Sequence, residues 1–296
     1  MRKLCFYIAL FGVLSCKKEI KIVVADKPAR LVVNAVVDPD SLLYFNLSTT
    51  QNITNNSPQQ YVSNGLIEVF NQDTTVLLAI LNHTTNGDYR SLFFKPDPLK
   101  TYFFKITALN RIYWVSDSLP DTVKCEVLDT SRLPFFQGKE NFFQVKMSLN
   151  DNNTLIPNYY GFRIKRFFET YQGADTLFSE EWVPLESIDY VLTENPKTKF
   201  SKKNLIFSDE NFSSSNMSLR FGAAGLFASG NQKTTKLMIY TSAYSRNAYN
   251  YFTSVNEHLF YQNDPFSQPT VLVGNIPGAF GAAVGACTKV NVIHFK

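Results

Sequence analysis

The sequence predicts a mainly β protein, with an immunoglobulin-like β-sandwich over residues 28–120 and a β-rich sandwich or barrel with one amphipathic helix over residues 121–296. Three observations lead to this prediction. Apolar and polar residues alternate in many short runs. Clusters of Asn, Asp, Gly, Ser and Pro separate these runs, as turns separate strands. Aromatic residues make up 15 % of the chain, mostly as 26 Phe and 15 Tyr, and such rings suit pleated sheets.

The N-terminal half contains strands of two kinds. Residues 31–37 are almost entirely apolar, as in a strand that is buried on both faces. In the next strand, Leu43, Phe45 and Leu47 alternate with more polar residues, which is typical of a strand with one buried face. The most regular alternation follows at residues 101–109. Further strands are expected at 65–70, 75–81 and 112–116, with turns at 38–41, 71–73 and 86–89. This succession of short strands is typical of an immunoglobulin-like sandwich, although the paired cysteines and central tryptophan of antibody domains are absent.

The C-terminal half is predicted to be β-rich with a single helix. After Ser245, which suits a helix N-cap, apolar residues recur at a spacing of three and four, so an amphipathic helix ending near Asn263 is expected. These residues are Tyr249, Phe252, Val255, Leu259 and Phe260. Residues 121–129 are expected to cross from the first half into the second. Strands are expected at 143–149, 159–168, 176–183, 205–207, 217–221, 236–241, 269–273 and 289–295.

The first residues predict an export signal with a lipidation site. Arg2 and Lys3 precede an apolar stretch at residues 4–14, which is too short to span a bilayer. Cys16 follows directly after the small residue Ser15, where a lipoprotein peptidase would cleave. We therefore expect a signal peptide over residues 1–16, acylation of Cys16 and a tether over residues 17–27. An ordinary signal peptide with an incidental cysteine is the alternative. Stable anchoring requires several acyl chains.

The charge of the chain argues against nucleic acid as a partner. Loss of Arg2 and Lys3 with the signal lowers the formal charge from +4 to +2. Binding to a phosphate backbone requires clustered Lys and Arg. The densest basic segments, residues 163–166 and 199–203, are expected to lie on solvated strand faces or in turns.

Two cysteines, Cys125 and Cys287, remain after removal of the signal, in the predicted first and last strands of the C-terminal half. An exported location permits a disulfide between them. Two buried free thiols are the alternative, and the sequence does not decide between them. The three histidines show no metal-ligand spacing, so no metal site is expected.

The sequence contains no catalytic signature. No nucleophile elbow, zinc-binding helix, Cys-x-x-Cys pair or phosphate-binding loop occurs. Asp38 with Asp40, and Asp209 with Glu210, offer oxygens for a calcium site, but solvated turn residues are the simpler interpretation. We expect neither a cofactor nor enzymatic activity.

A segment near the C-terminus carries a family resemblance. Residues 263–269 read Asn-Asp-Pro-Phe-Ser-Gln-Pro, Asn275-Ile276 follow, and residues 278–281 read Gly-Ala-Phe-Gly. These segments resemble the Asn-Pro-Phe-x-x-Pro and Asn-Ile-x-Gly signatures of a Bacteroidota lipoprotein family of unknown function, whose members are commonly encoded beside TonB-dependent outer-membrane receptors. Residues 31–34, 87–89 and 100–102 are similar to other parts of the family, so the resemblance spans nearly the whole chain after the signal. Pro277, Ala279 and the stretch 282–286 depart from the pattern.

The same segment is a candidate recognition loop, because loops of special conformation often present binding groups. Its prolines fix φ and its glycines allow turns closed to other residues, so a purely loop-shaping role is the simpler alternative. The candidate residues are Asp264, Pro265, Phe266, Pro269, Asn275, Ile276, Gly278, Phe280 and Gly281.

The resemblance implies an outer-membrane lipoprotein, on the cell surface or the periplasmic face, that acts as a non-catalytic accessory binding or docking module for a TonB-dependent receptor. Its expected contacts are the membrane, through its N-terminal lipid, and that receptor. A structural or adhesive surface protein is the alternative, and a carbohydrate hydrolase is a third hypothesis that no carboxylate pair in the sequence supports.

Overall fold

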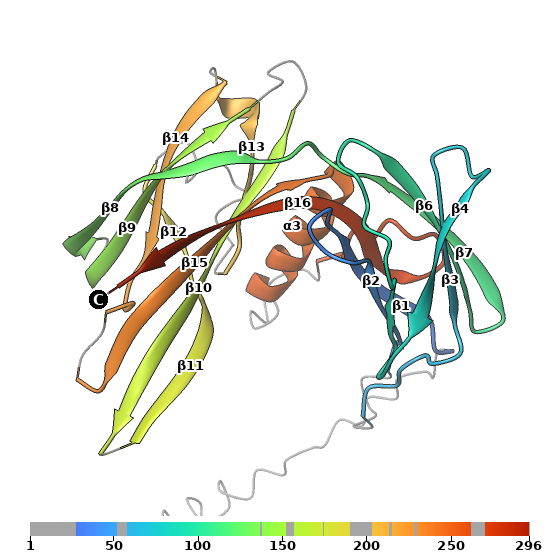
Figure 1. The fold of residues 1–296 in the computed structure, drawn as a ribbon, viewed down its shortest axis with the longest axis horizontal. Coiled ribbons are helices and arrows are strands. Elements are labelled where there is room, and N and C mark those ends of the chain that lie inside the picture. Colours follow the sequence, from blue (N-terminus) through green and yellow to red (C-terminus); the bar gives the residue numbers. More distant parts are fainter. Residues whose placement is uncertain are drawn as a thin grey trace, which may run out of the picture.

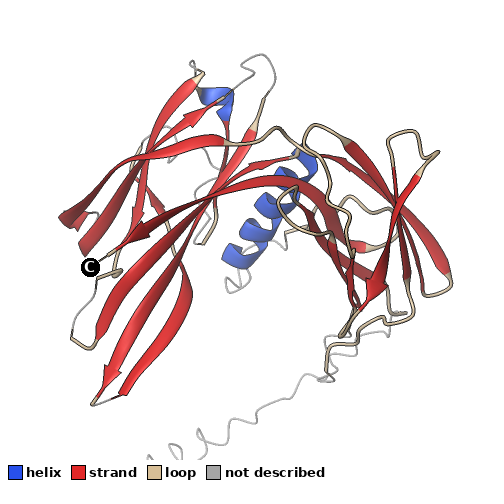
Figure 2. Ribbon diagram, viewed as in Figure 1, coloured by secondary structure: helices blue, strands red, loops and turns tan. Residues whose placement is uncertain are grey.

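A computed structural model describes residues 28–51, 58–136, 138–151, 157–173, 175–189, 203–212, 215–227, 230–261 and 270–295. The predicted signal peptide, the tether and Cys16 lie outside these ranges. Within them the protein is mainly β, as predicted, with large open sheets and one α-helix, α3 (Arg246–Tyr261) (Figures 1 and 2). No helix in this part of the chain has the length and apolar character that a membrane span requires.

The N-terminal unit has the strand order of an immunoglobulin-like sandwich. Four strands pair in the order β1-β2-β5-β4 and three in the order β3-β6-β7, and the β3–β4 hairpin joins the two groups. Residues at alternate positions point inward, so Phe45 on β2 meets Phe104 on β6 with ring centroids 5.1 Å apart. The strands are β1 (Leu31–Val37), β2 (Tyr44–Thr49), β3 (Leu66–Phe70), β4 (Leu77–His83), β5 (Asp88–Arg90), β6 (Thr101–Ala108) and β7 (Arg111–Ser118).

A tyrosine at the start of β6 strengthens the immunoglobulin-like assignment. Tyr102 is the second residue of β6, and its hydroxyl oxygen accepts a hydrogen bond of 2.7 Å from the backbone N–H of Asp97. A tyrosine that ties the start of this strand to the preceding loop is a hallmark of the fold. Trp114 lies on β7 and is exposed instead of central to the core.

The C-terminal unit is a sandwich of two sheets. One sheet has the order β12-β14-β9-β8, and the other has the order β11-β10-β15-β16, with β13 paired to the start of β10. The strands are β8 (Lys124–Phe136), β9 (Lys139–Asn150), β10 (Tyr159–Gln172), β11 (Asp175–Val183), β12 (Glu186–Ser187), β13 (Leu205–Ser208), β14 (Asn216–Ala223), β15 (Gln232–Tyr244) and β16 (Phe280–His294).

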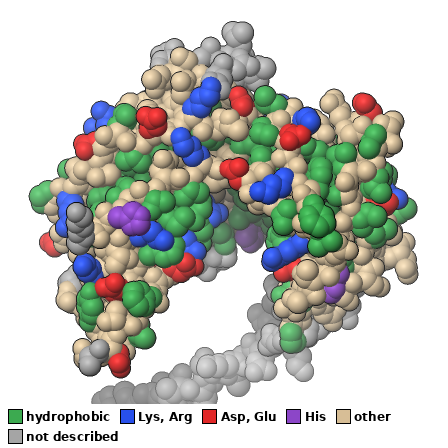
Figure 3. Space-filling view, viewed as in Figure 1, with side chains coloured by type: hydrophobic (Ala, Val, Ile, Leu, Met, Phe, Trp, Pro, Cys, Tyr) green, Lys and Arg blue, Asp and Glu red, His purple; other side chains and the backbone are tan. Residues whose placement is uncertain are grey.

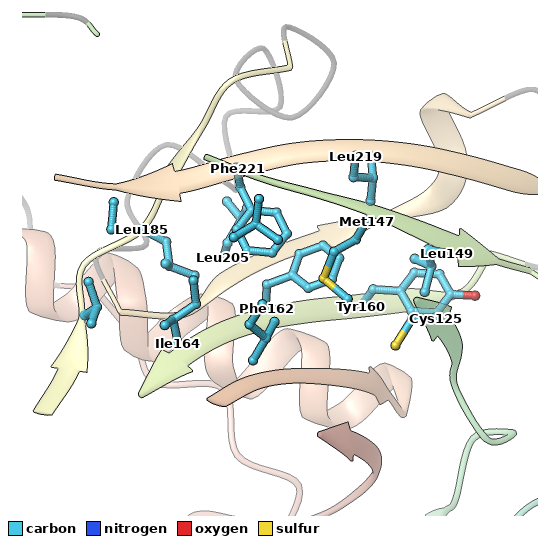
Figure 4. Close-up of a cluster of buried hydrophobic side chains, with 14 of the residues drawn as sticks. Cys125, Met147, Leu149, Tyr160, Phe162, Ile164, Leu185, Leu205, Leu219 and Phe221 are labelled. Carbon is cyan, nitrogen blue, oxygen red and sulfur yellow. The ribbon is translucent and has the colours of Figure 1, made fainter. Parts of the chain in front are cut away.

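Aromatic and aliphatic side chains fill the space between these two sheets (Figure 4). Phe162 projects from β10 and stacks on Phe221 of β14, with ring centroids 4.4 Å apart. Met147 and Leu149 of β9, which belongs to the same sheet as β14, extend into the same layer and face β10. The apolar residues at every second position of each strand thus form one continuous core.

Strand β16 belongs to both units. Its first half runs parallel to β1, from the pair Val32 and Phe280 to the pair Val37 and Gly285. Its second half pairs antiparallel with β15, so one sheet of twelve strands extends through the molecule (Figure 1). The predicted division after residue 120 falls between β7 and β8, but the first half of β16 completes the sheet of the N-terminal unit.

The predicted helix is confirmed. The Ser245 hydroxyl accepts a hydrogen bond of 3.0 Å from the backbone N–H of Ala248, as an N-cap does. The helix packs through Ala248 and Tyr249 against the small residues Ala282 and Ala286 of β16. Small side chains on β16 therefore let α3 lie close to the sheet.

Of the two strands predicted nearest the C-terminus, one is absent and the other begins earlier than predicted. Residues 270–273, the described part of the strand predicted at 269–273, form no strand. The Val273 backbone N–H donates to Ser254 Oγ on α3 over 2.9 Å. This backbone group is therefore satisfied by a side chain of the helix and not by a neighbouring strand. The last strand was predicted from residue 289, but β16 begins nine residues earlier, at Phe280.

Candidate functional site

A cleft of about 1090 Å³ lies where the two units meet. The turn between β1 and β2 and the loop before β6 form one wall, and strands β10, β15 and β16 with α3 form the other side. On the face seen in Figure 3, acidic and basic side chains lie close together in the middle of the molecule, between the units. The polar and aromatic residues that line it include Asp38, Asp40, Arg163, Tyr240, Ser242 and Thr288.

A buried carboxylate fixes the geometry beside the cleft. Asp117 of β7 accepts hydrogen bonds from the Ser245 hydroxyl, from the Gly285 backbone N–H at 2.7 Å and from Asn247 Nδ2 at 2.9 Å. Burial raises the pKa of the Asp117 carboxyl, although these hydrogen bonds oppose the rise. One side chain of the N-terminal unit thereby holds both the start of α3 and the middle of β16.

Arg163 is one of three cationic residues that line the cleft, with Lys95 and Lys289. It lies on the outer face of β10, because its neighbours Phe162 and Ile164 point into the core. Its Cζ lies 3.8 Å from the ring centroid of Trp182 and 5.9 Å from that of Tyr240. Within the described ranges its guanidinium forms no hydrogen bond and no ion pair, so its N–H groups remain available to a ligand.

The opposite wall of the cleft is acidic. Asp38 and Asp40 occupy the turn after β1, where Asp38 Oδ1 accepts a hydrogen bond of 2.9 Å from the Asp40 backbone N–H. Burial raises the pKa of Asp38, and hydrogen bonds from Thr288 on β16 act against this rise. The Ser242 and Thr288 hydroxyls, on the neighbouring strands β15 and β16, share a hydrogen bond of 2.9 Å. The cleft therefore combines the Asp38 turn, with Lys95 beside it, on one side with Arg163, Lys289 and these two hydroxyls on the other.

Both cysteines are buried free thiols with separate partners, so the structure does not contain the disulfide considered above. The Cys287 thiol donates to the Pro120 carbonyl over 3.1 Å, and Cys125 Sγ accepts a hydrogen bond from Asn291 Nδ2 at 3.5 Å. Burial, with the nearby charge of Asp38 adding to it, raises the pKa of Cys287 to about 12. A thiol with so high a pKa is a poor nucleophile at neutral pH.

The described part of the candidate recognition loop takes part in structural contacts away from the cleft. Asn275 bonds both backbone groups of Ala283, donating from Nδ2 to the carbonyl at 2.7 Å and accepting from the N–H at 3.0 Å. Ile276 is buried in the N-terminal core, and Arg30 lies 4.2 Å from the ring centroid of the half-exposed Phe280. Asp264, Pro265, Phe266 and Pro269 lie outside the described residues.

The two glycines of this loop are needed by its backbone. Gly278 and Gly281 both have a φ of +83°, which residues with a Cβ rarely adopt. A Cβ at Gly281 would lie 2.0 Å from the backbone oxygen of Val33 on β1. Gly281 thus allows β16 to approach β1.

A second polar cluster lies in the C-terminal unit, where Asn158 bridges two buried carboxylates. Its backbone N–H donates to Asp209 at 2.8 Å, and its Nδ2 donates to Asp151 at 2.9 Å and to Asp209 at 3.1 Å. Burial raises the pKa of Asp209, and Asp151 raises it further. In the part of the chain that the structure describes, no group of three or more His, Cys, Asp and Glu residues is placed to hold a metal ion.

The cleft residues carry no sequence motif. The segment 163–166 was expected on a solvated strand face or in a turn, whereas Arg163 lines the cleft and Arg166 is buried beside Thr234 and Glu181. The signal that could have located Arg163 was its alternation with Phe162 and Ile164, which places it on the face opposite the core.

A family model covers most of the chain. Residues 17–291 match the family described as "Domain of unknown function (DUF4249)". No curated protein matches the chain.

Proposed function

The chain belongs to the DUF4249 family, whose function is not defined, and we propose that it is an outer-membrane lipoprotein that serves as a non-catalytic accessory binding module for a TonB-dependent transporter. Its cleft is the binding site in this proposal. The expected acylation of Cys16 and the resemblance to lipoproteins encoded beside such receptors motivate the location and the partner.

The observation that carries the proposal is the construction of the cleft from both units. Clefts between domains are common ligand sites, since they combine apolar surface with a few polar groups of fixed direction. Here Tyr240 and Arg163 come from the C-terminal unit, Asp38 and Asp40 come from the N-terminal unit, and β16 runs through both. Asp117 ties the units together at the side of the cleft, so the two walls keep their spacing.

The thiol and the amine at the cleft already form hydrogen bonds within the protein, which supports a binding role over a catalytic one. Cys287 has a raised pKa and donates to a backbone carbonyl, and Lys289 Nζ donates to the Cys125 carbonyl over 2.8 Å. Among the described residues, neither group is paired with a base or with an acid that would activate it. Arg163 and the hydroxyls of Ser242 and Thr288 are suited to hold a ligand, not to attack one.

The proposal is tested by expressing the full chain and its Cys16→Ser variant in the native host. We expect the unchanged protein to partition with outer membranes and the variant to be released, because the thioether that carries the lipid cannot form on serine. We also expect the unchanged protein, solubilised in mild detergent, to co-purify with a TonB-dependent receptor. Membrane partition of the Cys16→Ser variant would refute the anchoring, and recovery of the lipidated protein without a receptor would refute the accessory role.

A further inference from the structure

A row of cations and aromatic rings extends from the cleft along the outer face of the C-terminal unit. Arg163 and Lys165 lie at alternate positions of β10, so both point away from the core. Arg163 stacks on Trp182 at 3.8 Å, while Lys165 Nζ lies 5.5 Å from the Trp182 centroid and 5.7 Å from that of Phe167. Lys236 of β15 lies 4.0 Å from the Phe167 centroid and continues the row.

The row has an excess of positive charge that the protein itself does not neutralise. Lys165 pairs with Glu180, whose side chain is half exposed. Arg163 and Lys236 form no ion pair with any described residue. A guanidinium that is stacked on a ring keeps its in-plane N–H groups free, and these fit a carboxylate in a bidentate manner. The surface is therefore complementary to a ligand that carries more than one anionic group.

The other polar groups of the cleft favour a ligand that also carries hydroxyl groups. The carboxylates of Asp38 and Asp40 accept hydrogen bonds, whereas Ser242 and Thr288 both donate and accept. A purely anionic ligand would be repelled by the aspartates, and a cationic one would be repelled by Arg163. A ring with a carboxylate on one side and hydroxyls on the other satisfies both walls. Tyr240, which also lines the cleft, offers flat apolar surface to such a ring.

We propose that the cleft and the adjoining row bind an acidic oligosaccharide, with Arg163 pairing the carboxylate of a uronate residue and the Asp38 turn accepting hydrogen bonds from its hydroxyls. This assignment rests on the binding role of the cleft in the proposed function and adds the class of ligand. An acidic peptide, whose backbone N–H groups also donate hydrogen bonds, is the competing ligand that the test includes.

The test uses the detergent-solubilised full chain without membranes or receptor. A Trp114→Phe exchange leaves Trp182 as the single tryptophan, since the chain has two, so its fluorescence reports on the ring under Arg163. The probes are tetragalacturonate, tetramannuronate, the fully methyl-esterified tetragalacturonate and hexaglutamate, and calorimetry gives the affinities. Methyl esterification removes the charge and keeps the sugar ring.

We expect at least one tetrauronate to bind, to change the Trp182 emission and to lose affinity as salt is added. Its methyl ester and hexaglutamate should bind about tenfold more weakly or not at all, because a charge-assisted hydrogen bond is worth roughly that factor. Arg163→Gln should weaken uronate binding by about tenfold or more, and Arg163→Lys by less. Arg132→Gln is the matched control, since Arg132 also lies 3.8 Å from a ring, that of Phe227, but outside the cleft.

Four outcomes would overturn the assignment. These are no binding of either tetrauronate, equal binding of the methyl ester, equal binding of hexaglutamate, and an Arg163→Gln affinity that changes no more than that of Arg132→Gln. A thermal unfolding scan of each variant shows whether a loss of binding reflects a loss of fold. Since no receptor is present, failure here leaves the co-purification result of the proposed function unaffected, and the reverse also holds.

Discussion

The Ser245 hydroxyl donates a hydrogen bond to the Asp117 carboxylate, although the two residues are 128 positions apart in the chain. Ser245 is the N-cap of α3, and Asp117 lies on the last strand of the N-terminal unit. The same carboxylate also accepts the backbone N–H of Gly285 in β16. The buried Asp117 carboxylate therefore links the N-terminus of α3 and the shared strand β16 to β7, the edge strand of the immunoglobulin-like sheet.

Removal of this carboxylate should destabilise the whole protein. Asp117→Ala leaves the Ser245 hydroxyl and the Gly285 N–H buried without an acceptor, and we expect a loss of about 2–4 kcal/mol in the free energy of unfolding. Ser245→Ala removes one of these bonds and the helix cap, so about 1–2 kcal/mol is expected. Urea unfolding followed by circular dichroism measures both. Asp73→Ala, in an exposed turn, is the control, and an Asp117→Ala effect no larger than the control's would contradict the role.

Gly281→Ala should separate β16 from β1. The new Cβ would lie 2.0 Å from the Val33 oxygen, in addition to the strain at a φ of +83°, and we expect a loss of at least about 3 kcal/mol. Gly138 has a φ of +82° and nothing within 4 Å of its ideal Cβ, so Gly138→Ala should cost only about 1–2 kcal/mol. The comparison isolates the steric contact from the backbone strain. Equal losses in the two variants, measured by thermal or urea unfolding, would show that the strands can move apart without penalty.

The stability of the C-terminal unit should depend on pH through Asp209. Its pKa in the fold is raised above the ordinary 3.8, mainly by burial, so the folded state binds a proton more tightly than the unfolded one. The contribution of this group to stability is then greatest below pH 3.8 and is lost as the pH rises through the raised pKa. Asp209→Asn does not titrate, and the variant should therefore gain stability relative to the unchanged protein as the pH rises from 3.5 to 7.

Urea unfolding at a series of pH values checks this prediction. Asp73→Asn, which removes an exposed carboxylate, serves as the control for a general change in net charge. A stability difference between Asp209→Asn and the unchanged protein that shrinks with rising pH would have the opposite sign and would exclude the argument.

The two thiols should resist modification in the folded state. Cys125 is buried away from a reagent, and Cys287 is buried with a pKa raised to about 12 and so forms little thiolate at pH 8. We expect no measurable reaction of either residue with iodoacetamide under native conditions and full reaction of both in urea, as read by mass spectrometry. Rapid native labelling of Cys287, or a Cys125–Cys287 crosslink on a non-reducing gel, would contradict the structure.

Periodicity located most strands and the helix, because each of these elements has one face against a core. The alternation of Tyr102, Phe104 and Ile106 is enough to predict β6. For α3, the N-cap residue and the spacing of three and four between apolar residues are enough. These signals are local, so they survive without knowledge of the rest of the fold.

The first half of β16 and the cleft were missed for physical reasons. Ala282, Ala283 and Val284 are buried on both sides, between α3 and the N-terminal core, so they show no alternation, and their small size resembles that of a flexible link. The cleft joins Asp38 to Arg163 across 125 positions, and only the pairing of β16 with both β1 and β15 brings them together. No local sequence pattern indicates that these two distant residues lie in one cleft.

The double pairing of β16 also sets the order in which the chain can mature. Asn34 of β1 finds its partner Ala282 only 248 residues later, and at roughly 5–20 residues per second of synthesis this separation is on the order of ten to fifty seconds. During that interval the open edge of β1 is available to wrong partners. The first half of the chain is therefore made early, and its sheet is completed only when the final strand arrives.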